Sequence, residues 1–179
     1  MFIIRPCQTY EDYAYAAELA AELAAWDSAE TQKLGLRAED VLNFYYPVEE
    51  ELHARSAATS GTTLLALAEG TPAACISFRE LGPGSCELKR LYVRPAFRGT
   101  GLGRRMIGSL IQTSTIAGYS HVCLETVQFM KDAIRLYEQA GFVPCEPYYP
   151  IPEMFRTITV FMQKELVVSA PALGLAPPS

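Results

Sequence analysis

Hydrophobic residues recur at a helical period in the first part of the chain. Between Thr9 and Trp26, alanine, leucine and tyrosine return every three or four residues, which predicts an amphipathic helix. Thr9 is the expected N-cap, and Asp12 follows three residues later, where a capping box usually has Glu or Gln. A second helical stretch covers about 37–58, and Pro47 should interrupt or kink it.

From residue 62 the pattern changes to that of strands. The runs 62–68, 73–81 and 86–93 are strand-like and are separated by short turns that contain glycine and proline. Three successive strands joined in this way predict an antiparallel meander. The remaining expected elements are a strand at 2–5, a helix at 101–118, a strand at 121–126, a helix at 130–140 and two further extended segments. Helices that alternate with strands after the meander indicate a parallel crossover, so the sheet should be mixed.

Length and composition favour one soluble domain. The chain has 179 residues, of which 50% are hydrophobic, and we expect a single domain over 1–166 followed by a flexible tail over 167–179. The net charge of -5 is opposite in sign to a phosphate-binding surface, so nucleic acid is not an expected partner. Because no run approaches the roughly 20 apolar residues of a membrane span and the N-terminus lacks a signal-peptide pattern, we expect a cytoplasmic protein that does not bind membranes.

The cysteines give no sign of disulfides or of a metal site. There are five, an odd number, with no Cys-x-x-Cys pair, and the two histidines lie far apart in the sequence. We therefore expect reduced thiols and no bound metal.

A glycine-rich turn follows the third strand of the meander and opens the next helix. It reads Arg98-Gly99-Thr100-Gly101-Leu102-Gly103-Arg104. Backbone N–H groups at such a helix start, with arginines beside them, form an anion site. The third glycine of a dinucleotide fingerprint and the Gly-Lys-Ser/Thr of a P-loop are both missing. The turn therefore predicts a different phosphate-bearing ligand, and a turn without any ligand is the alternative.

The strand before this turn shows a phase slip. Apolar residues fall at Cys86 and Leu88 and then at Leu91 and Val93, so the alternation skips one residue. A β-bulge near 89–91 would produce this pattern and would leave backbone groups to bind an extended ligand that contains amides. A strand buried on both faces is the alternative.

Two motifs resemble those of the GNAT superfamily of acyl-CoA-dependent N-acyltransferases. Residues 98–103 match that family's turn, Gln/Arg-x-x-Gly-x-Gly/Ala, and 136–142 match its Leu-Tyr-x-x-x-Gly-Phe helix end. The expected order of elements is also similar, so the resemblance covers nearly the whole chain. It implies an α/β (α+β-like) GNAT fold, with a mixed central sheet of about six to seven strands and helices on both faces. The bulged strand 86–93 and the strand 121–126 would part in a V.

The resemblance also implies a reaction and a cofactor-binding segment. The chain would transfer an acetyl group from acetyl-CoA to a primary amine by direct attack, without a metal. Backbone groups of Leu91, Tyr92 and Val93 would bind the pantetheine arm. The pyrophosphate would be held by Arg98, Gly99, Thr100, Gly101, Leu102, Gly103 and Arg104.

By the same resemblance, Tyr137 is the proton donor to the departing thiolate, and Glu87 or Glu125 is the base that takes a proton from the amine. Tyr137 packing in the core, and solvated carboxylates that only attract a cation, are the alternatives. Met130 stands where many family members have an Asn that contacts the cofactor.

The acceptor is expected to bind through the parts that vary among relatives. These are the first two helices and the loop 144–152, in which Tyr148 and Tyr149 either wall the acceptor pocket or cover the sheet edge. The net negative charge of the chain favours a small cationic amine as the acceptor, and a protein amine is the alternative. Dimers are common in the family, so a homodimer is one expected form. A non-catalytic acyl-CoA-binding or sensing domain is the alternative function.

Overall fold

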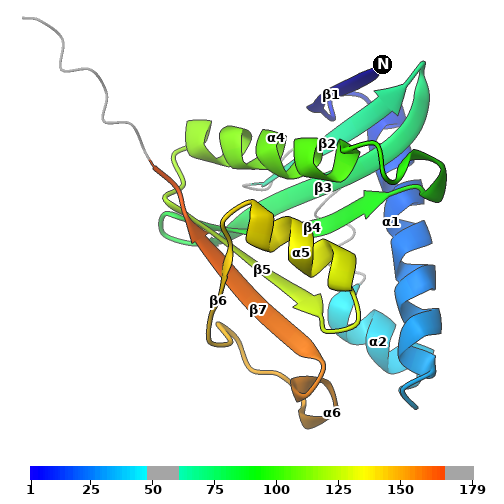
Figure 1. The fold of residues 1–179 in the computed structure, drawn as a ribbon, viewed down its shortest axis with the longest axis vertical. Coiled ribbons are helices and arrows are strands. Elements are labelled where there is room, and N and C mark those ends of the chain that lie inside the picture. The colour runs from blue at the N-terminus through cyan, green and yellow to red at the C-terminus, as the bar shows by residue number, and fades with distance from the viewer. Residues whose placement is uncertain (48–60, 168–179) are drawn as a thin grey trace, which may run out of the picture.

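The computed structural model describes residues 1–47 and 61–167 and contains one seven-stranded mixed sheet in the order β1-β2-β3-β4-β5-β7-β6 (Figure 1). The strands are β1 (Phe2–Pro6), β2 (Gly61–Ala68), β3 (Thr71–Gly82), β4 (Ser85–Val93), β5 (His121–Val127), β6 (Val143–Pro144) and β7 (Thr159–Glu165). The helices are α1 (Tyr10–Gln32), α2 (Ala38–Tyr45), α4 (Leu102–Ile116), α5 (Lys131–Gln139) and α6 (Glu153–Arg156), with a 3-10 turn, η1, at Pro95–Phe97. The mixed α/β class expected from the sequence is confirmed.

Helix α1 begins where the sequence predicts but runs further. The Thr9 hydroxyl accepts a hydrogen bond from the Asp12 amide at 3.1 Å, and the Asp12 carboxylate accepts one from the Thr9 amide at 3.2 Å, which completes a capping box with Asp in place of Glu. The helix continues past Trp26 to Gln32. Its last turns bury polar residues, and Thr31 satisfies its hydroxyl by donating to the Asp27 carbonyl at 2.8 Å. The spacing of apolar residues does not predict these last helical turns, because the residues they bury are polar.

The second predicted helix is only partly accounted for. Residues 38–45 form α2, which ends before Pro47 as the steric demands of proline require. The rest of the predicted stretch, 48–60, lies outside the described residues, as does the predicted tail from 168 onward.

Replacing Asp12 with Asn should lower the free energy of unfolding by about 1–2 kcal/mol, because the amide lacks the charge that strengthens the hydrogen bonds from Arg5. Asp12 accepts two hydrogen bonds from Arg5, at 2.6 and 2.7 Å, and these bonds hold the pKa of its carboxyl well below the ordinary value. Because the folded pKa is lowered, this stabilisation is complete above pH of about 4 and is lost as the pH falls further. Urea unfolding at pH 7 and pH 3 checks this. A difference between variant and wild type that does not shrink at pH 3 would contradict it.

The predicted meander and its bulge are confirmed. Strands β2, β3 and β4 pair antiparallel in succession. Between the pairs Cys75↔Tyr92 and Ser77↔Lys89, β3 advances two residues while β4 advances three. Arg90 takes up the extra length with a φ of 57, in the left-handed region. The phase slip in the sequence therefore reports a real β-bulge.

Strands β4 and β5 form the predicted V. They pair in parallel only from Ser85↔His121 to Leu88↔Leu124, at the closed end of the V. Beyond these pairs the two strands separate, while β5 pairs with β7 on its other side along its whole length, from His121 to Val127. The open end of the V leaves room for ligands within the sheet.

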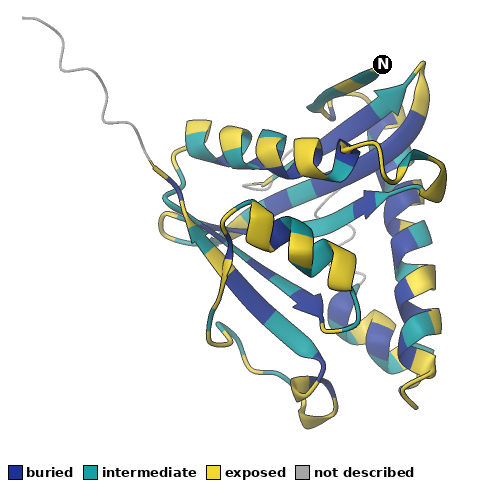
Figure 2. Cartoon of the chain, viewed as in Figure 1, coloured by how far each residue is buried: buried dark blue, intermediate teal, exposed yellow. Residues whose placement is uncertain are grey.

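Helices cover both faces of the sheet, as predicted. Leu64 and Leu65 are neighbours in β2 and point to opposite faces. Leu64 belongs to the cluster that contains Met106 of α4, and Leu65 to the cluster that contains Leu19 of α1. Figure 2 shows the corresponding alternation of buried and exposed positions along α1 and α4. The two helix layers support the V from opposite sides.

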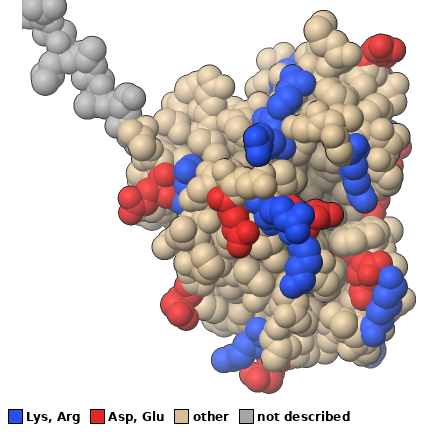
Figure 3. Space-filling model, viewed as in Figure 1, with Lys and Arg blue, Asp and Glu red and all other residues tan. Residues whose placement is uncertain are grey.

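Acidic and basic side chains are interspersed on the face shown in Figure 3. Within residues 1–47 and 61–167, none of the helices combines the length and the apolar character needed to cross a membrane.

Candidate active site

A groove with a volume of about 580 Å³ runs along the open end of the V. Its walls come from the end of α1, the bulged end of β4, the glycine-rich turn and α5. The lining includes nine of the ten predicted cofactor-binding residues: Leu91, Tyr92, Val93, Arg98, Gly99, Gly101, Leu102, Gly103 and Arg104. Thr100 does not line the groove, and its hydroxyl instead donates to the Phe97 carbonyl at 2.7 Å, which closes the turn.

The glycine-rich turn presents open backbone to the groove. Gly99 and Gly101 have φ values of +75 and +80, and no atom lies within 4 Å of where a Cβ would stand at either position. Gly101 is the N-cap of α4, so the free N–H groups of the first helical turn begin at the groove. At Gly103 a Cβ would approach Leu136 Cδ1 to 3.0 Å, so this glycine lets α4 and α5 pack closely.

Two arginines are fixed at the edges of this turn. Arg98 donates from Nε to the Val93 carbonyl at 3.0 Å, and its guanidinium lies over the Tyr92 ring at 5.8 Å from the centroid. Arg104 donates to the Gln139 side chain at 2.9 Å. Helix-start amides flanked by guanidinium groups are a phosphate-binding arrangement.

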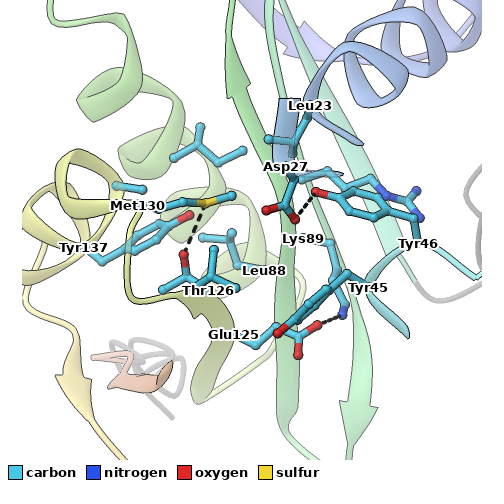
Figure 4. Close-up of a pocket in the computed structure, with 14 residues that line it drawn as sticks. Leu23, Asp27, Tyr45, Tyr46, Leu88, Lys89, Glu125, Thr126, Met130 and Tyr137 are labelled. Atoms are coloured by element: carbon cyan, nitrogen blue, oxygen red, sulfur yellow. Dashed lines mark hydrogen bonds and ion pairs between the residues drawn. The ribbon is translucent and has the colours of Figure 1, made fainter. Parts of the chain in front are cut away.

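A second, smaller cavity of about 80 Å³ lies deeper in the V (Figure 4). It shares Leu23, Leu91, Met130 and Ala133 with the groove, so the two cavities meet at these residues. Its other lining residues are Asp27, Tyr45, Tyr46, Leu88, Lys89, Arg90, Glu125, Thr126, Val127 and Tyr137.

Tyr137 lines the smaller cavity with its hydroxyl directed inward (Figure 4). The side chain is buried, and its ring packs against Phe142 at 5.9 Å between centroids. Burial raises the pKa of the phenol well above its ordinary value, so Tyr137 keeps its proton at neutral pH. The ring of Tyr137 thus packs in the core while its hydroxyl faces the cavity, and its role as proton donor stays a prediction.

Met130 lies at the junction of the two cavities. It is the N-cap residue of α5, and its sulfur accepts a hydrogen bond from the Thr126 hydroxyl at 3.6 Å. The residue that departs from the family's Asn therefore forms part of the wall between groove and cavity.

The two predicted bases have different surroundings. Glu125 lines the smaller cavity and accepts a hydrogen bond from Lys89 at 2.8 Å. Glu87 is fully buried and lines neither cavity. It binds Arg79 at 2.8 and 2.9 Å and accepts a hydrogen bond from the Tyr148 hydroxyl at 2.8 Å. The Lys89 ammonium links the two, since it also lies 3.4 Å from Glu87.

Tyr148 and Tyr149 of the loop 144–152 cover the sheet rather than line either cavity. Both rings contact Phe161 of β7, with centroids 5.0 and 5.3 Å away. Tyr148 is connected to the site through its hydrogen bond to Glu87.

Asp27 is a cavity residue that the sequence reasoning missed. It lies on the extended part of α1, is 2% exposed, and accepts a hydrogen bond from the Tyr46 hydroxyl at 3.1 Å. Burial raises the pKa of its carboxyl to about 6, opposed by the Tyr46 hydrogen bond and assisted by the charge of Glu125. Its position four residues after Leu23, on the inward face of the helix, is the signal that could have identified it.

The sheet order, the bulged fourth strand and the glycine turn at the mouth of the groove together define the class of acyl-CoA-binding transferases. Residues 15–142 match the family model of the acetyltransferase (GNAT) family, and the chain therefore belongs to this family. The resemblance inferred from the two motifs is confirmed.

Several relatives of known sequence are named as acetyltransferases. An uncharacterised N-acetyltransferase of Schizosaccharomyces pombe is 43% identical over 100 residues, which cover 54% of this chain and 58% of that protein. An IAA acetyltransferase of Azospirillum brasilense is 34% identical over 107 residues, which cover 58% of this chain and 67% of that protein. Three of the curated relatives are matched over 58%, 30% and 34% of their own lengths, so the chain aligns with only part of each.

Solved structures share the fold over most of the chain. A GNAT acetyltransferase from Staphylococcus aureus has a TM-score of 0.67 at 15% identity, covering 93% of this chain and 99% of that one. The ribosomal-protein-S18-alanine N-acetyltransferase of Escherichia coli has a TM-score of 0.65 at 19% identity, covering 98% of this chain and 100% of that one.

Proposed function

We propose that this protein is an acyl-CoA-dependent N-acyltransferase that transfers an acetyl group from acetyl-CoA to a primary amine by direct attack. The observation that carries the proposal is the meeting of two cavities inside the V. A large groove with a phosphate-binding turn joins a small cavity lined by a protonated tyrosine and a carboxylate. Family membership supports the same reaction class.

The residues of the groove fit coenzyme A. The open backbone at Gly99 and Gly101 and the guanidinium groups of Arg98 and Arg104 would hold its pyrophosphate. In the described part of the chain, β4 beyond Leu88 has no pairing partner on the β5 side. Its backbone groups there would hydrogen-bond the pantetheine arm as an added strand does. When bound, the thioester supplies the carbonyl carbon that an amine attacks.

Within the smaller cavity, we assign the proton transfers to Glu125 and Tyr137. The acceptor enters as an ammonium and releases one proton to solvent, which frees the lone pair of its nitrogen. Glu125 then accepts a second proton from this nitrogen as it bonds to the acyl carbon. Tyr137 donates its phenolic proton to the sulfur as the carbon–sulfur bond breaks, and the proton on Glu125 returns to Tyr137 through solvent. Glu87 is the alternative base, acting through water, although its ion pairs favour a role in positioning.

The proposed location is the cytoplasm. All five cysteines are free in the structure, a state that reducing compartments maintain.

Acetyl-CoA and CoA should raise the unfolding temperature of the protein, whereas NAD and ATP should not. A ligand present at 100 times its dissociation constant adds about 2.7 kcal/mol if it binds only the folded state. Differential scanning fluorimetry with each ligand at the same concentration measures this. Equal stabilisation by ATP or NAD would mean that the turn holds some other phosphate-bearing ligand and would overturn the assignment.

A further inference from the structure

Asp27 has an incomplete set of hydrogen bonds, and so do Arg90 and Glu125, which line the same cavity: in the described residues Arg90 Nε and Glu125 Oε2 are also buried and make no hydrogen bond. The Oδ2 of Asp27 accepts from Tyr46, but within the described residues no donor reaches Oδ1, although the side chain is only 2% exposed. A buried carboxylate oxygen without a donor is costly and rare in folded proteins. The carboxylate lines the smaller cavity, so a ligand there can complete its bonding (Figure 4).

The groups that face Asp27 come from every element around the cavity. Leu23 precedes it by one turn on α1, Tyr45 and Tyr46 come from the end of α2, and Met130 comes from the start of α5. The charged groups are Lys89 and Arg90 from β4 and Glu125 from β5. The ammonium of Lys89 is engaged by Glu125 at 2.8 Å and lies 3.4 Å from Glu87. Lys89 therefore pairs with the two glutamates, and the cavity holds the carboxylates of Asp27 and Glu125 and the guanidinium of Arg90 beside aromatic walls.

We propose that Asp27 binds the positively charged amine of the acyl acceptor and so selects cationic amines as substrates. This inference rests on the proposed function and identifies its substrate class. Carboxylates and the faces of tyrosine rings both attract ammonium groups. Leu23 lies at the junction with the groove, and Asp27 follows it by four residues, a rise of about 6 Å along the helix. An ammonium held by Asp27 therefore lies close to the point where the acyl group enters.

The size of the cavity limits the part of the acceptor that enters. A volume of about 80 Å³ accommodates a short unbranched alkylamine or the amine end of a longer molecule. We therefore choose n-propylamine as the probe and n-propanol as its uncharged counterpart of similar size.

The test compares two aspartates of the same helix. Asp27→Asn keeps the shape of the side chain and removes its charge, and Asp12→Asn does the same at a buried position that lies outside both cavities. With saturating acetyl-CoA, Asp27→Asn should raise the KM for n-propylamine about tenfold or more, since hydrogen bonds to charged groups are among the strong ones. The KM for acetyl-CoA should stay the same, and Asp12→Asn should change neither value. An unchanged amine KM in Asp27→Asn would overturn the proposal.

A pH profile adds a readout that a purely structural role would not move. Because the carboxyl of Asp27 has a pKa of about 6, the wild-type amine KM should rise as the pH falls below that value. In Asp27→Asn this rise should be absent. An identical rise in the two proteins would assign it to another group and contradict the role of Asp27.

A binding measurement separates this inference from the proposed function. The unfolding temperature is recorded with n-propylammonium chloride, with n-propanol and with sodium chloride at matched concentration, without any acyl donor. We expect n-propylammonium to stabilise the wild type and Asp12→Asn above both references, and to give no such gain in Asp27→Asn. Absence of the gain in the wild type, or its persistence in Asp27→Asn, would refute binding at Asp27. Failure of acetyl transfer to any amine would instead refute the proposed function while this binding result stands.

Discussion

Replacing Tyr137 with Phe should lower kcat by about 10²–10³-fold, the usual contribution of a positioned proton donor. The phenol lines the cavity and retains its proton at neutral pH because burial raises its pKa. The substitution removes only the hydroxyl, so the ring contact with Phe142 and the affinity for acetyl-CoA should persist. Steady-state kinetics measure kcat, and calorimetry measures the affinity for acetyl-CoA.

Tyr119→Phe is the matched control for this substitution. Tyr119 also packs against the main core, with its ring 5.7 Å from that of Phe78, but it lies outside both cavities. Its kcat should equal that of the wild type. Wild-type turnover in Tyr137→Phe would show that the thiolate obtains its proton elsewhere and that Tyr137 only packs.

Replacing Glu87 with Gln should produce the largest loss of stability, about 3 kcal/mol in the free energy of unfolding. The carboxylate is fully buried and engages Arg79, Lys89 and Tyr148. The neutral amide therefore removes the negative charge that Arg79 binds, while Lys89 keeps Glu125. Removal of one partner from a buried ion pair costs about 3–5 kcal/mol, and we take the lower end because Arg79 is partly exposed. Chemical denaturation at pH 7 measures the difference.

Glu125→Gln distinguishes a base from a positioning residue. Glu125 lines the cavity and Glu87 does not, so kcat per folded molecule should fall by about 10²-fold in Glu125→Gln and by clearly less in Glu87→Gln. The loss in the free energy of unfolding should be larger in Glu87→Gln than in Glu125→Gln. A larger loss of kcat in Glu87→Gln, measured at a temperature where both variants are folded, would make Glu87 the base.

The features that the sequence predicts well depend on local chemistry. Three features have a sequence pattern that spans only a few neighbouring residues, and the structure contains all of them. They are the capping box at Thr9, the glycine turn at 98–104 and the bulge near Arg90. The parallel crossover also follows from the order of elements, because a helix between two strands imposes it.

The features that the sequence does not predict depend on contacts between distant segments. Asp27 enters the cavity because α1 continues past Trp26 with polar residues that are buried by the rest of the fold. The bond between Tyr148 and Glu87 joins residues 61 positions apart, and it places Tyr148 over the sheet rather than at the cavity. No local pattern encodes the bond between Tyr148 and Glu87, and the helical spacing of Asp27 from Leu23 is the one local signal for its position.

The most direct test of the central claim is the release of thiol from acetyl-CoA in the presence and absence of n-propylamine, with the acylated amine identified by mass spectrometry. We predict thiol release that depends on the amine, equals the amount of N-acetylpropylamine formed and is lost in Tyr137→Phe. Binding of acetyl-CoA without amine-dependent release, over a panel of small amines and peptides with free amino groups, would contradict catalysis and indicate a domain that binds acyl-CoA without reacting.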